Sequence, residues 1–537
     1  MADPLAITFG LLASSGDPQS VDLLIAALDS EDPVIRRHAT SAMSRRGSGR
    51  GLIEVVRRLQ ILDIESRNEL TEHASKLSAS LKQCLLHGDA QLRLNALELT
   101  LASQDFDQIE SLVTLLRDRS CAQHEQVAQT INALTDLLFD HIHLQSSAPP
   151  PGGRYLRNAP QVRSRYLNAL DVGVTTYAKL ALPEPLVHGI LVLAEPEHLA
   201  AKRLMANPSP ECRELARRLL MTDTHPGVMR LILESLSRNY PLPSTLDAIA
   251  RRRDVEFVTT LLRWIPERPT VFQQKNLRNV TNLVWLDDSG KLLEQIPPGL
   301  QPALVTFLSA TGVSGPRKIG VQEWLVRHGT PEGRGAASGV LDFLDDASVQ
   351  GILEEGLESQ DADVQAWATS QIRPHAVPNA MAMLVERLDS PLAAVREAAQ
   401  QELSDFSLER LLDLFEHLDH EACRRAGVLL RKIDPHCTRK LDRELSHAVR
   451  RRRIRAARAT HAFGMASEVA PALLIMLDDD DPLVRRTAIE VLADVPMVEI
   501  QEVLVDRLND DSPRVRDAAR KSLEQWNEAY GGVLTAK

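Results

Sequence analysis

The sequence is poor in aromatic residues and in cysteines. Aromatic side chains make up only 4% of the 537 residues, whereas the strands of β-sandwiches and barrels favour Tyr, Phe and Trp. The cysteines stand singly, without any CxxC pair: Cys84, Cys121, Cys212, Cys423 and Cys437. This pattern indicates neither a disulfide framework nor a zinc ribbon, and it predicts a reducing compartment, the cytoplasm.

Long apolar runs are also missing. No uninterrupted run reaches the roughly 18 residues that a membrane-spanning helix needs, so we expect no membrane insertion. The N-terminal segment MADPLAITFGLLASSGD has no basic stretch before its short apolar run, which is untypical of a signal peptide. The 62 Lys and Arg against 73 Asp and Glu leave a net charge of −11. The chain as a whole is therefore not a polyanion binder, although a local basic patch is compatible with this balance.

No catalytic motif is convincing. The sequence has no GxGxxG after a strand, no GxxxxGK[ST], no HExxH and no GxSxG. His417, His420 and Cys423 are close in sequence, but zinc needs three or four ligands that converge tetrahedrally. We interpret Cys423 as a buried structural cysteine beside two surface histidines. We therefore predict that the protein is not an enzyme and that it holds no metal and no cofactor.

What the sequence does contain is a repeated helix start. DPLVRRTA at 481–488 is echoed by SPRVRDAA at 512–519. Related starts recur at steps of 31, 31, 28, 31, 30 and 31 residues, at Arg334, Gln365, Arg396, Arg424, Arg455, Arg485 and Arg516. Each unit has apolar residues at helical spacing in two successive segments, which predicts a pair of helices, A and B, in every repeat.

The turn between the two helices is chemically specified. Asp or Ser before Pro supplies an N-cap followed by a proline at the first helical position, at Asp32, Ser390, Asp481 and Ser512. An alanine three residues after the marker position allows close helix approach, at Ala39, Ala96, Ala216, Ala337, Ala368, Ala399, Ala488 and Ala519. One helix pair cannot cover its own apolar face, but stacked copies share a core, so a solenoid is predicted.

The pattern Asp-x-x-Val-Arg-x-x-Ala resembles HEAT repeats, particularly the short bacterial HEAT-like or PBS-lyase-type kind, over 331–530 and 17–100. The resemblance implies an all-α fold, a right-handed α-solenoid of stacked antiparallel helix pairs (an armadillo-type superhelix). The family also places an Asp six residues before the Arg, as at Asp479 and Asp510. Gln365 in place of Arg should interrupt any polar ladder along the repeats. The fit is loosest around Arg455, where Arg458 occupies the alanine position.

Composition divides the chain into four segments. Residues 145–331 hold 19 of the 30 prolines, and QSSAPPPGGRYLRNAP cannot be helical throughout. We therefore expect N-terminal HEAT-like repeats at 1–144, a loop or linker at 145–163, degenerate helical repeats at 164–330 and regular repeats at 331–537. A distinct helical insert is the alternative for 164–330.

One basic run, RRRRIRAAR, stands at the start of a B helix, where cations oppose the helix dipole. Its members are Arg450, Arg451, Arg452, Arg453, Arg455 and Arg458. Stacked repeats would place the acidic run 478–481 beside it, so the two runs could neutralise each other. A polyanion such as nucleic acid is the other candidate partner, although no aromatic platform for single strands lies between Phe415 and Phe463.

The leading functional hypothesis is a scaffold that binds another protein on a concave B-helix face, the use to which HEAT-like arrays are mostly put. Its candidate contacts are Glu397, Gln401, Arg486, Glu490, Asp517 and Lys521. Nucleic-acid binding through the arginine run is the alternative. A bilin-lyase-like or other modifying role is a third reading that the resemblance allows.

Overall fold

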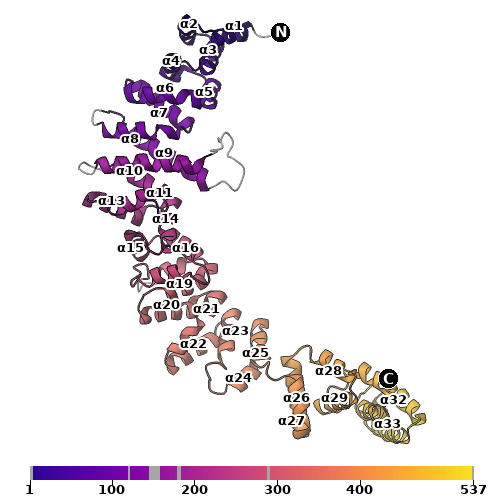
Figure 1. The fold of residues 1–537 in the computed structure, drawn as a ribbon. Helices are drawn as coiled ribbons and strands as arrows, with labels where there is room; N and C mark the ends of the chain where they lie inside the picture. Colours follow the sequence, from indigo (N-terminus) through magenta and orange to yellow (C-terminus); the bar gives the residue numbers. More distant parts are fainter. Residues whose placement is uncertain (1–3, 119–120, 144–157, 178–182, 287–290, 535–537) are drawn as a thin grey trace. The chain divides into compact units, whose positions relative to one another are not determined.

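The computed structural model describes residues 4–118, 121–143, 158–177, 183–286 and 291–534. Every regular element within these ranges is a helix (Figure 1). The chain divides into two compact units, residues 1–321 and 322–537, and each is an α-solenoid by itself. The expected all-α fold class is confirmed.

Unit 1 is built from short helices in two rows. Alternate helices pack on one another, so that α3 contacts α1 and α5, while α4 contacts α2 and α6. The helices of the unit are α1 (Pro4–Ser14), α2 (Gln19–Leu28), α3 (Pro33–Arg46), α4 (Gly49–Arg57), α5 (Ile64–Glu72), α6 (Ala74–His87), α7 (Ala90–Ala102), α8 (Ile109–Arg117), α9 (His124–His143), α10 (Ala159–Tyr177), α11 (Glu184–Leu193), α12 (Leu199–Met205), α13 (Pro210–Thr222), α14 (Pro226–Leu236), α15 (Pro243–Arg251), α16 (Val255–Trp264), α17 (Val271–Leu277), α18 (Lys291–Gln295) and α19 (Gln301–Ala310). Helix α20 (Gly315–His328) crosses the division.

Unit 2 is the more regular stack. Its B helices are α21 (Pro331–Ala337), α23 (Ala362–Gln371), α25 (Ala393–Glu402), α27 (His420–Ile433), α29 (Arg450–Phe463), α31 (Pro482–Leu492) and α33 (Pro513–Leu534). Its A helices are α22 (Asp346–Leu357), α24 (Ala380–Arg387), α26 (Leu408–Leu414), α28 (Cys437–Leu445), α30 (Ala470–Ile475) and α32 (Val498–Asp506). Each B helix packs on the next B helix, and from α26 onward one hydrophobic cluster runs from Leu408 to Trp526. The repeats therefore share a continuous core, as expected of a solenoid.

The predicted capping contact is made at three sites. Asp32 and Asp481 cap α3 and α31, each accepting a hydrogen bond of 2.8 Å from the backbone N–H two residues later. Ser390 accepts the same bond at 3.2 Å from the backbone N–H of Leu392, but the expected helix start is wrong there, because α25 begins only at Ala393 with Leu392 as its N-cap. The eight marker alanines are confirmed as core positions, each with no exposed surface: Ala39, Ala96, Ala216, Ala337, Ala368, Ala399, Ala488 and Ala519.

The loop expected at 145–163 falls mostly outside the described residues, which omit 144–157. Its last part is helical, since α10 begins at Ala159, so the expected boundary lies too far along the chain. Between residues 164 and 330 every regular element that the structure describes is a helix.

One contact between B helices needs a glycine. Gly427 in α27 lies so close to the end of α29 that a Cβ atom there would stand 2.2 Å from the Phe463 carbonyl oxygen and 2.7 Å from its Cβ. Backbone atoms cannot move aside as a flexible side chain does. This position therefore fixes how closely α27 and α29 approach.

We expect Gly427→Ala to lower the free energy of unfolding by about 1–3 kcal/mol, the usual cost of overpacking. The matched control is Gly351→Ala in α22, where a Cβ would meet nothing within 4 Å and a helical alanine is favoured over glycine. Urea unfolding followed by circular dichroism checks both variants. Equal stability of the two would contradict the contact.

Candidate functional site

The arginine of the repeated helix start ties the B helix to the turn before it. Nη1 of Arg485 donates hydrogen bonds to the carbonyl oxygens of Asp479, at 2.8 Å, and Asp480, at 3.3 Å. Nη1 makes the same pair of bonds, to the carbonyls six and five residues earlier, in Arg36, Arg213, Arg396, Arg453 and Arg516. We call this contact the turn hook. It satisfies carbonyl groups left without partners where a helix has ended.

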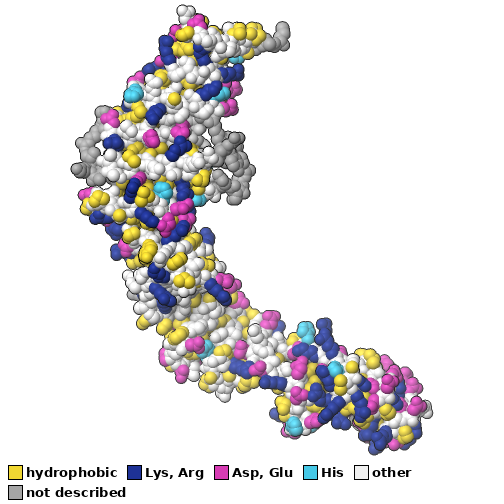
Figure 2. All heavy atoms as spheres, viewed as in Figure 1, with side chains coloured by type: hydrophobic (Ala, Val, Ile, Leu, Met, Phe, Trp, Pro, Cys, Tyr) yellow, Lys and Arg dark blue, Asp and Glu magenta, His cyan; other side chains and the backbone are white. Residues whose placement is uncertain are grey.

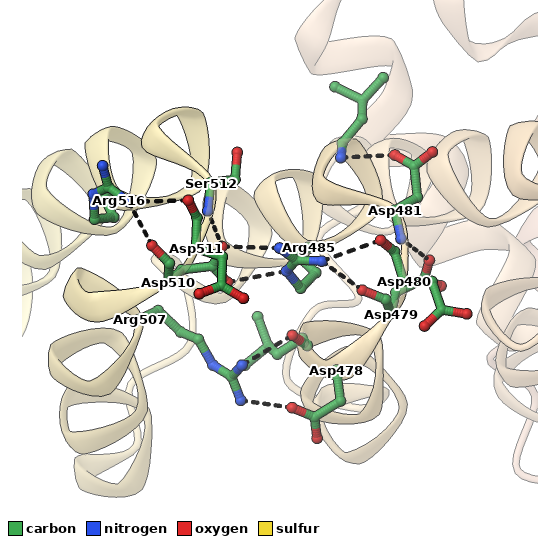
Figure 3. A network of polar contacts seen from close by, with 12 residues as sticks. Asp478, Asp479, Asp480, Asp481, Arg485, Arg507, Asp510, Asp511, Ser512 and Arg516 are labelled. Atoms are coloured by element: carbon green, nitrogen blue, oxygen red, sulfur yellow. Dashed lines mark hydrogen bonds and ion pairs between the residues drawn. The ribbon is translucent and has the colours of Figure 1, made fainter.

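In two successive repeats the hook arginine also reaches the next repeat. Nη2 and Nε of Arg485 bind the two carboxylate oxygens of Asp510 at 2.9 and 3.0 Å (Figure 3). Arg453 pairs with Asp479 more weakly: Nη2 donates one hydrogen bond of 3.0 Å to a carboxylate oxygen, while Nε lies 2.8 Å from the other oxygen as an ion pair without a hydrogen bond. These side chains are largely buried, down to 5% exposure for Asp510. The resulting Arg–Asp ladder joins α29, α31 and α33 through charge-assisted contacts, and the contact between Arg485 and Asp510 is bidentate.

Each aspartate of the ladder also orders its own turn. Asp479 accepts from the backbone N–H of Asp481 at 3.0 Å, and Asp510 accepts from that of Ser512 at 2.8 Å. The hydrogen bonds from Arg485 hold the pKa of Asp510 below its usual range, although burial opposes this shift. One carboxylate thus links the repeat before it to the cap of the helix after it.

In two repeats the structure places another residue at the hook position than the marker residue predicted from the sequence. In α29 the hook is Arg453, not Arg455, and the alanine three residues later is the fully buried Ala456. In α27 the position belongs to Cys423, not Arg424. Its Sγ contacts the carbonyl oxygens eight and five residues earlier, the carbonyls that Arg93 and Arg334 use in their repeats.

The ladder is restricted to the last repeats of unit 2. Gln365 makes only one turn bond, to the carbonyl of Ser359, and within the described ranges the ladder does not pass through it, as expected. Arg396 makes both turn bonds, but Ser390 replaces the ladder aspartate of its own repeat. Gln365 at the arginine position and Ser390 at the aspartate position are neutral, so neither can form the ion pair of the ladder.

Most of the arginine run is paired within the chain. Arg450 lies 2.9 Å from Asp481, Arg453 binds Asp479, and Arg455 lies 2.7 Å from Asp413. Arg452 binds Glu444, with Nε at 2.9 Å. Two members remain, Arg451 and Arg458, which are exposed and have no ion pair in the part of the chain that the structure describes.

Nucleic-acid binding by this run therefore remains a prediction with two free cations to support it. A gel shift at low salt tests it. If the run binds nucleic acid, retardation should weaken steeply with salt and disappear in an Arg451→Ala/Arg458→Ala variant. These two substitutions leave the four internal pairs in place, so the fold is preserved.

All six predicted partner contacts are exposed. They are Glu397 and Gln401 on α25, Arg486 and Glu490 on α31, and Asp517 and Lys521 on α33. On each helix they follow the hook arginine by one and five residues, so they share one face of the helix. The ladder joins α29, α31 and α33. We call the positions one and five residues after the hook arginine on these three helices the outer row. Within it Arg486 lies 2.7 Å from Glu490.

The corrected register adds two residues to the outer row. On α29 the positions one and five residues after Arg453 are Ile454, which is half-buried, and Arg458, which is exposed. With Arg455 as the predicted marker, Ile454 and Arg458 did not fall on these two positions. A signal was present in the sequence, since Ala456 follows Arg453 by the same three residues that separate arginine and alanine elsewhere.

With this geometry established, comparison with known proteins gives one match by sequence. A profile described as HEAT repeats matches residues 440–525. This segment carries HEAT repeats. The matched residues include the whole of α29, α30, α31 and α32, and therefore most of the ladder. No curated protein matches the chain.

Several solved structures also resemble this chain. A Kap121p mutant is 12% identical, over 96% of this chain, with a TM-score of 0.23. The match covers 62% of that protein, less than two thirds of its length. Kap95p from a study of RanGDP is 10% identical, over 98% of this chain and 75% of its own, with a TM-score of 0.26. Importin beta is 11% identical, over 95% and 90%, with a TM-score of 0.19. The scores are low, and nothing about partners follows from them.

Two further properties bear on the site. None of the described helices is long and apolar enough to cross a membrane. Cys423 is buried, whereas His417 and His420 are exposed, and no three potential ligands converge on a metal position among the residues that the structure places.

We expect Arg485→Ala to lower the free energy of unfolding by about 1.5–3 kcal/mol, because it breaks hydrogen bonds to a charged group and leaves Asp510 buried without its partner. The control is Arg455→Ala, whose pair with Asp413 is solvent-exposed and is worth less than about 1 kcal/mol. Guanidinium unfolding of both variants provides the measurement. An equal loss in the two would show that the ladder does not stabilise unit 2.

The ladder also predicts a pH dependence. Because the pKa of Asp510 is lowered on folding, its stabilising contribution is complete above the unfolded value of about 3.9 and is lost as the pH falls through the folded value. We therefore expect Asp510→Asn to be less stable than the parent at pH 7, with the difference shrinking towards pH 3. Unfolding midpoints at both pH values measure it, and a constant difference would contradict the assignment.

Proposed function

We propose that the chain is a non-enzymatic HEAT-repeat scaffold that binds another protein through the outer row of α29, α31 and α33. The observation that carries this proposal is the buried Arg453–Asp479 and Arg485–Asp510 ladder. It holds three B helices at fixed spacing, so their exposed side chains form a preorganised surface. A surface that does not have to be ordered on binding keeps more of its interaction energy as affinity.

The charges of the outer row favour a protein over a polyanion. At the position five residues after the hook, Arg458 and Lys521 are positive and Glu490 is negative; at the position one residue after it, Arg486 is positive and Asp517 is negative. The surface over α28–α33 accordingly shows both signs (Figure 2). A pattern of mixed sign selects a partner with complementary charges, whereas a phosphate backbone would meet repulsion at the acidic positions. The cytoplasm is the proposed location, since all five cysteines are free and buried.

The test is a comparison of two double charge reversals. Arg458→Glu/Lys521→Glu changes the outer row, and Arg439→Glu/Arg443→Glu makes the same change on two exposed arginines of the A helix α28. Neither pair takes part in the ladder. Affinity purification from the native host, with cross-linking and mass spectrometry, compares the proteins recovered by the parent chain and by each variant.

We expect at least one protein to bind the parent chain and the α28 variant but to fall at least tenfold in the outer-row variant. Cross-links from that protein should reach α31 or α33. Recovery of the same proteins at the same levels by all three chains would refute the outer row as the binding face.

A further inference from the structure

Two helices of unit 1 are capped by a histidine ring. His225 is the N-cap of α14, and its Nδ1 accepts a hydrogen bond of 3.0 Å from the backbone N–H of Gly227. His198 caps α12 in the same way, with Nδ1 accepting from the backbone N–H of Ala200 at 3.2 Å. The usual capping residues Asn, Ser and Thr carry an oxygen that accepts at any pH, whereas a ring nitrogen accepts only while it holds no proton. Both caps therefore require a neutral histidine.

The His225 cap lies at a close contact between α14 and α11. Gly227 is so near α11 that a Cβ atom there would stand 2.5 Å from the carbonyl oxygen of Val192. Arg230, one turn farther along α14, donates to the same oxygen at 3.5 Å. The cap thus orders the turn of α14 that packs on α11.

A second histidine connects the same turn to α11. Nε2 of His188 lies 3.1 Å from a carboxylate oxygen of Asp223, and the other oxygen of Asp223 accepts from the backbone N–H of His225 at 2.8 Å. The rings of His188 and His225 meet edge to face, with 5.7 Å between their centres. Nδ1 of His188 is buried and has no hydrogen-bond partner among the described residues. A second proton on this ring would therefore find no acceptor.

Groups of both signs surround the two capping rings. Those around His225 are Asp136, Asp140 and His143 on α9, His188 on α11, Asp223 in the turn before α14 and Arg230 on α14. Those around His198 are Arg163 and Asp171 on α10 and Glu195 in the turn before α12. Burial outweighs the nearby carboxylates and lowers the pKa of His225 and of His198.

Protonation of His225 acts against the cap in two ways. It places a proton on Nδ1, so that two N–H groups point at one another, and it puts a positive charge at a helix N-terminus, which the helix dipole disfavours. Because the pKa of His225 is lowered on folding, the cap contributes in full above the unfolded value of about 6.5. Its contribution is lost as the pH falls from that value through the folded value.

We propose that α11 and α14 form an acid-sensitive joint of unit 1, in which protonation of His225 releases the first turn of α14 from its cap and loosens that turn against α11. His198 gives the start of α12 the same sensitivity. The release is local, because the following turns of α14 are held by the fully buried side chains of Leu231, Ile232 and Leu236.

Hydrogen exchange measured by mass spectrometry on the full chain tests the joint at pH 7.5 and pH 5.5, after correction for the intrinsic exchange rate at each pH. In the parent we expect protection of residues 226–229 to fall about fivefold on acidification, the usual worth of a side-chain N-cap. His225→Asn keeps an acceptor oxygen and should be equally protected at both pH values. His225→Ala has no acceptor and should be about as poorly protected at pH 7.5 as the parent is at pH 5.5.

His198→Asn is the matched control within unit 1. It should remove the pH dependence at the start of α12 and leave that of α14 unchanged, while His420→Asn, at an exposed histidine of α27, should leave both unchanged. Protection of residues 226–229 that does not vary with pH in the parent would overturn the proposal. An equal pH dependence in the parent and in His225→Asn would also overturn it, as would equal protection of the parent and His225→Ala at pH 7.5.

Discussion

Burial of apolar surface between repeats is the interaction on which this molecule depends. A pair of short helices exposes as much hydrocarbon as it covers, and only a neighbouring pair removes the remainder from water. The cluster from Leu408 to Trp526 shows the result, a core that passes from one repeat to the next. The alanines after the marker position belong to this constraint, because any larger side chain would hold neighbouring helices apart.

Hydrophobic contact alone does not set the spacing of the repeats, and polar contacts supply that precision. The turn hook uses the charged head of an arginine to bind carbonyl groups that no helix satisfies, and the ladder extends the same side chain to the next repeat. Where the ladder is complete, through the Arg453–Asp479 and Arg485–Asp510 pairs, the exposed faces of α29, α31 and α33 are fixed relative to one another. Structure and proposed function meet in this segment, since a preformed row of charges is what a protein partner would bind.

Periodicity and turn residues were enough to predict helix pairs, the buried alanines and the solenoid, because local capping and apolar spacing act within a single repeat. Asp479 and Asp510 were also recognised, because the resemblance to HEAT repeats implies an aspartate six residues before the arginine. The sequence could not tell whether Arg453 or Arg455 makes the turn hook, because in a run of arginines several registers place the same residue type at the hook position. Only the tertiary structure decides which guanidinium reaches the carbonyls of its turn and the carboxylate of the next repeat. The same holds for Cys423 and Gly427, whose roles come from the way α27 meets its neighbours in space.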